Sequence, residues 1–111
     1  MDFDVRVENS RTSVSLSGRL DAVTAPVCEQ KFRDLIAGDN LSLVVDFEAL
    51  EYISSMGLRT LLVLAKLVKE NNGRVCLANV NHHVRSVFEI SHFTSIFEIK
   101  DSVAEALAAI S

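Results

Sequence analysis

The 111-residue sequence has no tryptophan, one proline and two cysteines, and its basic residues are fewer than its acidic ones. A formal net charge of -4 argues against a protein that binds nucleic acid through its surface charge. Neither Cys28 nor Cys76 belongs to a Cys-x-x-Cys pair, and both lie among apolar neighbours, so we expect buried thiols in a reducing compartment. No apolar run approaches the roughly 20 residues of a membrane span, and the polar N-terminus is unlike a signal peptide. These absences predict a cytoplasmic protein that contacts neither a membrane nor nucleic acid.

The motifs of common catalytic and nucleotide sites are also missing. The sequence contains no G-x-G-x-x-G, no G-x-x-x-x-G-K-[ST] and no G-x-S-x-G. His82, His83 and His92 have no cysteine or carboxylate at a familiar metal-ligand spacing, so we expect them at the surface. A catalytic set that assembles only in space would leave no such trace. We therefore predict that the protein is not an enzyme and holds no metal and no cofactor.

What is present is material for one domain, which we expect to span residues 1–111. Hydrophobic residues make up 49% of the chain, enough for a single core. Alternation over residues 3–8 and 13–17 predicts an antiparallel hairpin with one wet face. The nearly continuous apolar runs at 41–47 and 75–80 are typical of central strands covered on both faces, and 96–99 predicts a short strand.

Helical spacing fills the segments between these strands. The first predicted helix is capped by Thr24 and ends at Gly38, and the second begins near Ser54 or Ser55 and ends at residues 72–73. A short helix is expected around 84–88, and a last one follows the capping-box pair Ser102 and Glu105. Strands that alternate with helices after a hairpin predict an α/β fold, with a mixed sheet covered by about four helices.

The second helix has more apolar residues than one covered face needs. We expect its buried face to consist of Leu58, Leu61, Leu62, Ala65 and Val68. Val63, Leu64 and Leu67 lie off that face. They either pack on the neighbouring helix or, together with Met56, form a docking patch beside Arg59.

The most informative stretch is 44–62, VVDFEALEYISSMGLRTLL, in which a buried strand ends at Asp46 and a short loop leads to a helix. The first turn of a helix has unpaired N–H groups and a partial positive charge, so a serine there is a good cap and a phosphoserine there would be well held. Gly57 would allow another backbone or a phosphate to come close. Asp46 is expected to hold the loop by hydrogen bonds.

Three segments together resemble the STAS family (sulfate transporter and anti-sigma factor antagonist). They are SLSGRLDAVTAP (15–26), VVDFEALEYISSMGLRTLL (44–62) and NNGRVCLANV (71–80), and the resemblance covers essentially the whole chain. It implies an antagonist that binds an anti-sigma factor, itself a serine kinase of the histidine-kinase-like ATPase fold. We expect the free protein to be a monomer. That kinase would phosphorylate a serine at the start of the second helix and break the complex, and a serine phosphatase would restore it.

The resemblance and the possible docking patch on the second helix together suggest which residues contact the partner. These candidates are Asp21, Thr24, Ser54, Ser55, Met56, Gly57, Arg59 and Val63. The family pattern Asp-Ser-Ser-Gly is changed here, because Met56 stands where the phosphoserine should be and Ser54 replaces the aspartate. We predict Ser55 as the acceptor, with Ser54 second. Asp21 either orients the serine hydroxyl, contacts the partner or simply caps its own loop.

Three other interpretations stay open at this point. The domain could be a scaffold that binds its partner constitutively, because Met56 cannot be phosphorylated. It could sense a small ligand or a nucleotide, although no phosphate-binding motif supports this. A receiver-like domain phosphorylated on Asp46 is the third, but it lacks the acidic residues and the lysine that such a site needs.

Overall fold

The computed structural model describes residues 1–8, 10–37 and 41–110. Its elements follow the predicted order, with one added 3-10 turn, η1. They are β1 (Asp2–Glu8), β2 (Arg11–Leu20), α1 (Ala25–Leu35), β3 (Ser42–Ile53), α2 (Ser55–Glu70), β4 (Arg74–Ala78), α3 (His82–Ile90), η1 (Phe93–Ser95), β5 (Glu98–Lys100) and α4 (Val103–Ala109). Gly38, predicted to end the first helix, lies outside the described residues. No helix in the described ranges is both long and apolar enough to cross a membrane.

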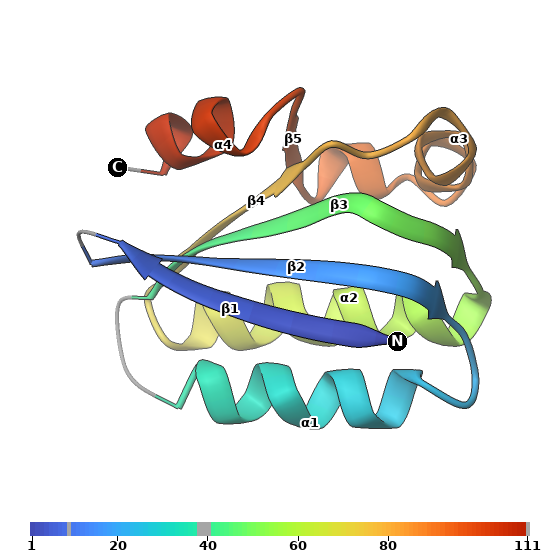
Figure 1. Ribbon diagram of the computed structural model, residues 1–111, viewed down its shortest axis with the longest axis horizontal. Helices are drawn as coiled ribbons and strands as arrows, with labels where there is room; N and C mark the ends of the chain where they lie inside the picture. The colour runs from blue at the N-terminus through green and yellow to red at the C-terminus, as the bar shows by residue number, and fades with distance from the viewer. Residues whose placement is uncertain (9, 38–40, 111) are drawn as a thin grey trace.

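The five strands form one sheet in the order β1-β2-β3-β4-β5 (Figure 1). β1 and β2 pair antiparallel, and the other three pairings are parallel. The predicted mixed sheet with an N-terminal hairpin is thus confirmed. The parallel pairings follow from the helical crossovers, which return the chain to the same edge before each new strand.

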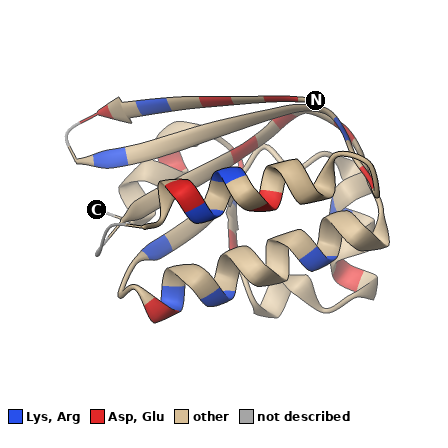
Figure 2. Ribbon diagram, turned by 90° about the horizontal axis from the view of Figure 1, so that it is seen from below, with Lys and Arg blue, Asp and Glu red and all other residues tan. Residues whose placement is uncertain are grey.

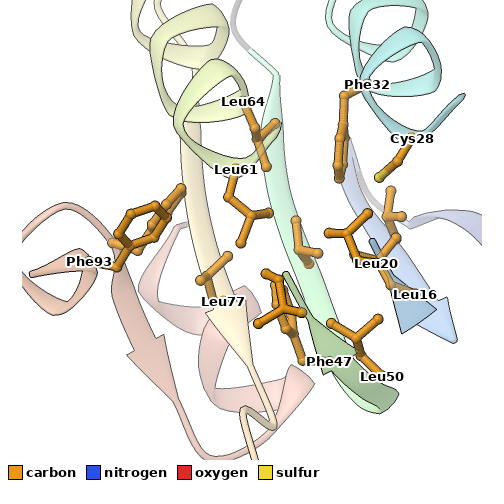
Figure 3. Packing of buried hydrophobic residues seen from close by; sticks show 14 of the residues in the cluster. Leu16, Leu20, Cys28, Phe32, Phe47, Leu50, Leu61, Leu64, Leu77 and Phe93 are labelled. Carbon is orange, nitrogen blue, oxygen red and sulfur yellow. The ribbon is translucent and has the colours of Figure 1, made fainter. Parts of the chain in front are cut away.

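Helices cover the sheet on both faces. α1 and α2 lie side by side below the sheet in Figure 1, and α4 lies above it. On β3, Leu43, Val45 and Phe47 join the cluster under α1 and α2 (Figure 3), whereas the intervening Val44 joins the cluster under α4. A strand buried on both faces needs apolar residues at consecutive positions, which explains the continuous run in the sequence.

α2 buries a different set of residues from the one predicted. Leu61 and Val68 are buried as expected, but Leu64 is fully buried while Leu62 is 43% exposed. The reason is that α2 packs against α1 as well as against the sheet, and Thr60 donates a hydrogen bond to the Ala25 carbonyl oxygen at 3.4 Å. The buried side of the helix therefore turns toward α1, and the helical spacing alone does not reveal this.

β3 is longer than the sequence predicts. Asp46 does not end it, and the expected loop after residue 47 is strand as far as Ile53, which pairs with Leu20 of β2. The added part is hard to recognise because β4 pairs with β3 only up to Asp46, so residues beyond it are partly exposed and include acidic ones. The pairing of β2 with β3 has two register irregularities, one next to Gly18 at φ 88°, and at each of them β3 advances one residue more than β2.

The buried face of the hairpin includes fewer residues of β1 than the sequence predicts. Phe3 packs edge-on against Phe32 of α1, with 4.9 Å between ring centroids. Val5 and Val7, on the same side of the strand, are 46% and 69% exposed.

Both cysteines are buried and free, as predicted, and His82, His83 and His92 are exposed.

Candidate functional site

The start of α2 is tied to the end of β2 by backbone and side-chain hydrogen bonds. Ser54 is the N-cap, and its hydroxyl accepts a hydrogen bond from the Gly57 N–H at 3.2 Å. The Ser54 N–H donates to the Leu20 carbonyl oxygen at 2.9 Å. The predicted helix start is confirmed, and the cap leaves the helix entrance fixed to the sheet.

A glycine is needed at position 57 because the start of α2 lies very close to the end of β2. A Cβ atom on Gly57 would lie 2.7 Å from the Leu20 carbonyl oxygen and 2.7 Å from Cγ1 of Ile53. The sequence predicted that this glycine lets another backbone come near, and that backbone is the protein's own β2. Since Gly57 is buried, it shapes the site by packing and presents no surface to a partner.

Ser55 and Met56 form the exposed part of the entrance. Ser55 is the first residue of α2, and its hydroxyl makes no hydrogen bond within the described ranges. Met56 follows it and is 39% exposed. Ser55 is therefore an accessible hydroxyl beside the unpaired N–H groups of a helix N-terminus, where a negative group is favoured.

One side of α2 continues this surface away from the entrance. Arg59 is exposed one turn after Ser55, and Val63 is half-buried one turn further. Leu62, which the sequence assigned to the buried face, belongs to this exposed side. Arg59, Lys66 and Lys69 are the basic residues of α2, whose only acidic residue is Glu70 at its end (Figure 2), so the helix is basic in an acidic protein.

Asp21 folds its own loop. Its Oδ1 accepts hydrogen bonds from the N–H groups of Val23 and Thr24, at 3.0 and 3.1 Å. The hydrogen bond from the Thr24 N–H is the main cause that lowers the pKa of this carboxyl group. No hydrogen bond joins Asp21 to Ser54 or Ser55 among the described residues, so its geometry fits the loop-capping alternative.

Thr24 does not cap α1 in the predicted way. It occupies the N-cap position, but its hydroxyl makes no bond to the helix. The hydroxyl instead accepts from the Asp21 N–H at 2.9 Å and donates to the Arg19 carbonyl oxygen at 2.8 Å. The prediction of a capping bond was wrong because the loop competes for the same side chain.

The sequence missed a pair of residues at this end of the sheet. Arg19 and Tyr52 are register partners on β2 and β3, and the guanidinium carbon lies 4.2 Å from the tyrosine ring centroid. Arg19 Nε also lies 3.8 Å from Asp21 Oδ2. Only the pairing register of β2 and β3 could have predicted this contact. The sequence did not reveal that register, because the end of β3 was predicted to be a loop.

Asp46 was predicted to hold a loop by hydrogen bonds; it does make hydrogen bonds, but it lies within β3, where the expected loop is strand. Its Oδ1 accepts hydrogen bonds from the side-chain amide of Asn79 at 2.9 Å and from the Glu48 N–H at 3.0 Å. Ser15 Oγ lies 3.5 Å from Oδ2. These bonds assign the carboxylate a structural role, and the described residues contain no group of three or more His, Cys, Asp or Glu side chains that could hold a metal.

The sequence and the fold both match a known family. The STAS domain family matches residues 2–106. This protein belongs to the STAS domain family. Its sequence is 37% identical over 94 residues to BtrV of Bordetella bronchiseptica, which is provisionally named an anti-sigma factor antagonist. The aligned region covers 85% of this chain and 81% of BtrV.

Solved STAS structures share the fold over nearly the whole chain. An anti-sigma factor antagonist from Mycobacterium paratuberculosis superposes with a TM-score of 0.89 at 26% identity, covering 98% of this STAS domain and 92% of that chain. The Bacillus cell fate determinant SpoIIAA in its phosphorylated form superposes with a TM-score of 0.73 at 21% identity, covering 99% and 100%. BtrV and the Mycobacterium paratuberculosis protein are both named as anti-sigma factor antagonists.

Proposed function

We propose that this STAS domain is an anti-sigma factor antagonist, which binds an anti-sigma factor through the entrance of α2 and the loop after β2. The observation that carries the proposal is the exposed pair Ser55 and Met56 on a helix start that is fixed to β2. Buried packing around Gly57 keeps this surface in one geometry, so little conformational entropy is lost on docking. The partner we propose is an anti-sigma factor that is a serine kinase of the histidine-kinase-like ATPase fold.

Phosphorylation of Ser55 would switch this surface off. The Ser54 hydroxyl is occupied as the helix cap, whereas the Ser55 hydroxyl is exposed, which supports Ser55 as the first acceptor. A phosphate adds about -1.5 to -2 units of charge. Arg59 lies one turn along the helix at the spacing that suits an ion pair, so the phosphate would both crowd the surface and neutralise its nearest cation. A serine phosphatase would then restore binding.

The test measures the intact mass of the purified protein after incubation with ATP and the serine kinase encoded beside its gene. The expected result is a gain of one phosphate, which is retained in Ser54→Ala and absent in Ser55→Ala. Because Ser54→Ala removes only the helix cap, it is a matched control for effects on the helix entrance. A phosphate that maps to another residue would contradict the assignment of Ser55.

Docking is tested separately by titrating the same kinase against surface variants. Met56→Glu places a charge on the proposed surface, and we expect a loss of affinity of at least about tenfold. Ile90→Glu is the control, because Ile90 is 80% exposed on α3, away from α2. Equal affinity of the two folded variants would remove Met56 from the docking surface.

Met56 also favours a second candidate function, a constitutive antagonist. A methionine cannot accept phosphate at the position where the family carries its phosphoserine. Stable binding to the kinase without any gain in mass would support this candidate, and phosphorylation of Ser55 would eliminate it.

A further inference from the structure

An apolar pocket lies apart from the α2 entrance, between the start of β1, the loop after β2 and α1. It has a volume of about 230 Å³ and is lined in part by Phe3, Val23, Val27 and Cys28. This lies between the ~150 Å³ cavity that admits benzene and the ~300 Å³ at which ordinary ligand pockets begin. The pocket is therefore large enough for a short alkyl chain or a single ring.

Two apolar residues that line this pocket are exposed to solvent instead of being buried in the core. Val23, in the turn before α1, is 83% exposed, and Val27, in the first turn of α1, is 59% exposed. Cys28 is 2% exposed, and burial raises the pKa of its thiol to about 12, so the pocket contains an uncharged sulfur group. Exposed apolar side chains that gather around a concave surface are typical of a binding site.

Lys31 has the one charged side chain among the residues that line the pocket, which also include Met1 with its N-terminal ammonium group. Its ammonium nitrogen lies 5.6 Å from the ring centroid of Phe3, and it forms no ion pair within the described parts of the chain. The other polar lining side chain, Thr24, already uses its hydroxyl within the loop. A ligand's polar group would thus find one charged side chain, which is a cation.

We propose that this pocket binds a short-chain amphipathic anion. The alkyl chain lies among Phe3, Val27 and Cys28, and the anionic head group pairs with the Lys31 ammonium. The match rests on complementary chemistry, because an apolar tail removes valine and phenylalanine surface from water while the head group meets the unpaired cation. The pocket borders the loop after β2, which is part of the proposed docking surface, but this proposal does not depend on the binding of an anti-sigma factor.

Octanoate is the probe, and its binding is measured by calorimetry and by the methyl NMR signals of the valines. We expect a dissociation constant below about 1 mM. Octyltrimethylammonium, which has the same chain with the opposite charge, should bind about tenfold more weakly. Acetate, which lacks the chain, should not bind measurably.

Two variants identify the pocket, and each has a control of the same chemistry elsewhere. Val27→Glu should weaken octanoate binding, whereas Val7→Glu, at a 69% exposed valine outside the pocket, should not. Lys31→Glu should reverse the preference from octanoate to octyltrimethylammonium, whereas Lys66→Glu on α2 should leave it unchanged.

Each outcome decides the proposal. Binding that follows this pattern supports it. Absence of octanoate binding, equal loss in Val27→Glu and Val7→Glu, or a preference that Lys31→Glu does not reverse would overturn it. If Val27→Glu abolishes binding of the kinase while octanoate does not bind, the pocket belongs to the protein partner instead.

Discussion

The two faces of the sheet are stabilised very differently. On one face, α1 and α2, of 11 and 16 residues, cover a cluster that includes Phe32, Phe47 and Leu64. On the other face, the seven-residue α4 covers a small cluster around Val44, Cys76 and Ile110. Most apolar burial, and with it most of the hydrophobic stabilisation, therefore lies on the face that holds α2.

This difference matters for the proposed function. The surface at the start of α2 belongs to the strongly packed face, and Ser54, Gly57 and Leu20 fix it to β2. A docking surface held in this way keeps its shape in the absence of a partner. We expect α4 to open locally at a lower free energy than α2, since local stability follows local burial.

The largest expected effect compares equivalent truncations on the two faces. Leu64→Ala on the α2 face should lower the free energy of unfolding by about 3–4 kcal/mol, and Ile110→Ala on the α4 face by about 2 kcal/mol. The smaller value reflects a short terminal helix whose surroundings can collapse into the space. Urea unfolding followed by circular dichroism measures both, and equal losses would contradict the difference between the faces.

Gly57→Ala tests the junction between α2 and β2. The added methyl group would overlap the Leu20 carbonyl oxygen and Ile53, so we expect a loss of about 1–3 kcal/mol in the free energy of unfolding. Ser55→Ala, two residues earlier at an exposed position, should change stability by less than about 0.5 kcal/mol. Both values come from the same denaturant titration, and a neutral Gly57→Ala would show that the helix start can shift freely.

The N-caps of α2 and α4 allow the same comparison between the two faces, with smaller expected losses of stability. Ser54 caps α2 and Ser102 caps α4, each by accepting an N–H three residues ahead, at 3.2 and 3.1 Å. Ser54→Ala should cost about 1 kcal/mol, and Ser102→Ala about 0.5 kcal/mol because α4 contributes less to the folded state. Hydrogen exchange of the first-turn amides locates each effect. A larger loss from Ser102→Ala would reverse the proposed ranking.

The smallest expected effect is the pH dependence contributed by Asp21. Its pKa is lowered in the folded protein, first by the hydrogen bond from the Thr24 N–H. Its stabilising contribution is therefore present above the unfolded pKa of about 3.8 and is lost as the pH falls through the lower folded value. The Asp21→Asn variant lacks this contribution at every pH. The difference in free energy of unfolding between the wild type and Asp21→Asn should therefore become smaller below about pH 4 than at neutral pH. Unfolding titrations between neutral and acidic pH check this, and a gap that widens on acidification would contradict it.

Element order and two helix starts were predictable because they depend on local patterns. The continuous apolar run at 41–47 predicted a central strand, and the Ser54 and Ser102 caps marked their helix starts correctly. In the candidate site, the accessible hydroxyl of Ser55 and the glycine three residues after the cap also followed from sequence spacing.

Other features of the site depend on neighbours that are distant in the sequence. The Arg19 and Tyr52 contact exists only because two strands pair in one register. Asp21 had three possible roles in the sequence; its hydrogen bonds lie within its own loop, and contact with a partner stays a prediction. The pocket near Lys31 requires β1 and α1 to lie together, which no local pattern states.

The sequence by itself determined the alternation of strands and helices, the burial of both cysteines and the STAS resemblance. Each of these rests on periodicity or on residues close together in the chain. Only the tertiary structure decided that Leu64 is buried and Leu62 exposed, and that β3 continues to Ile53. The physical reason is that the buried side of a helix and the length of a strand are set by what packs beside them, and those partners come from elsewhere in the chain.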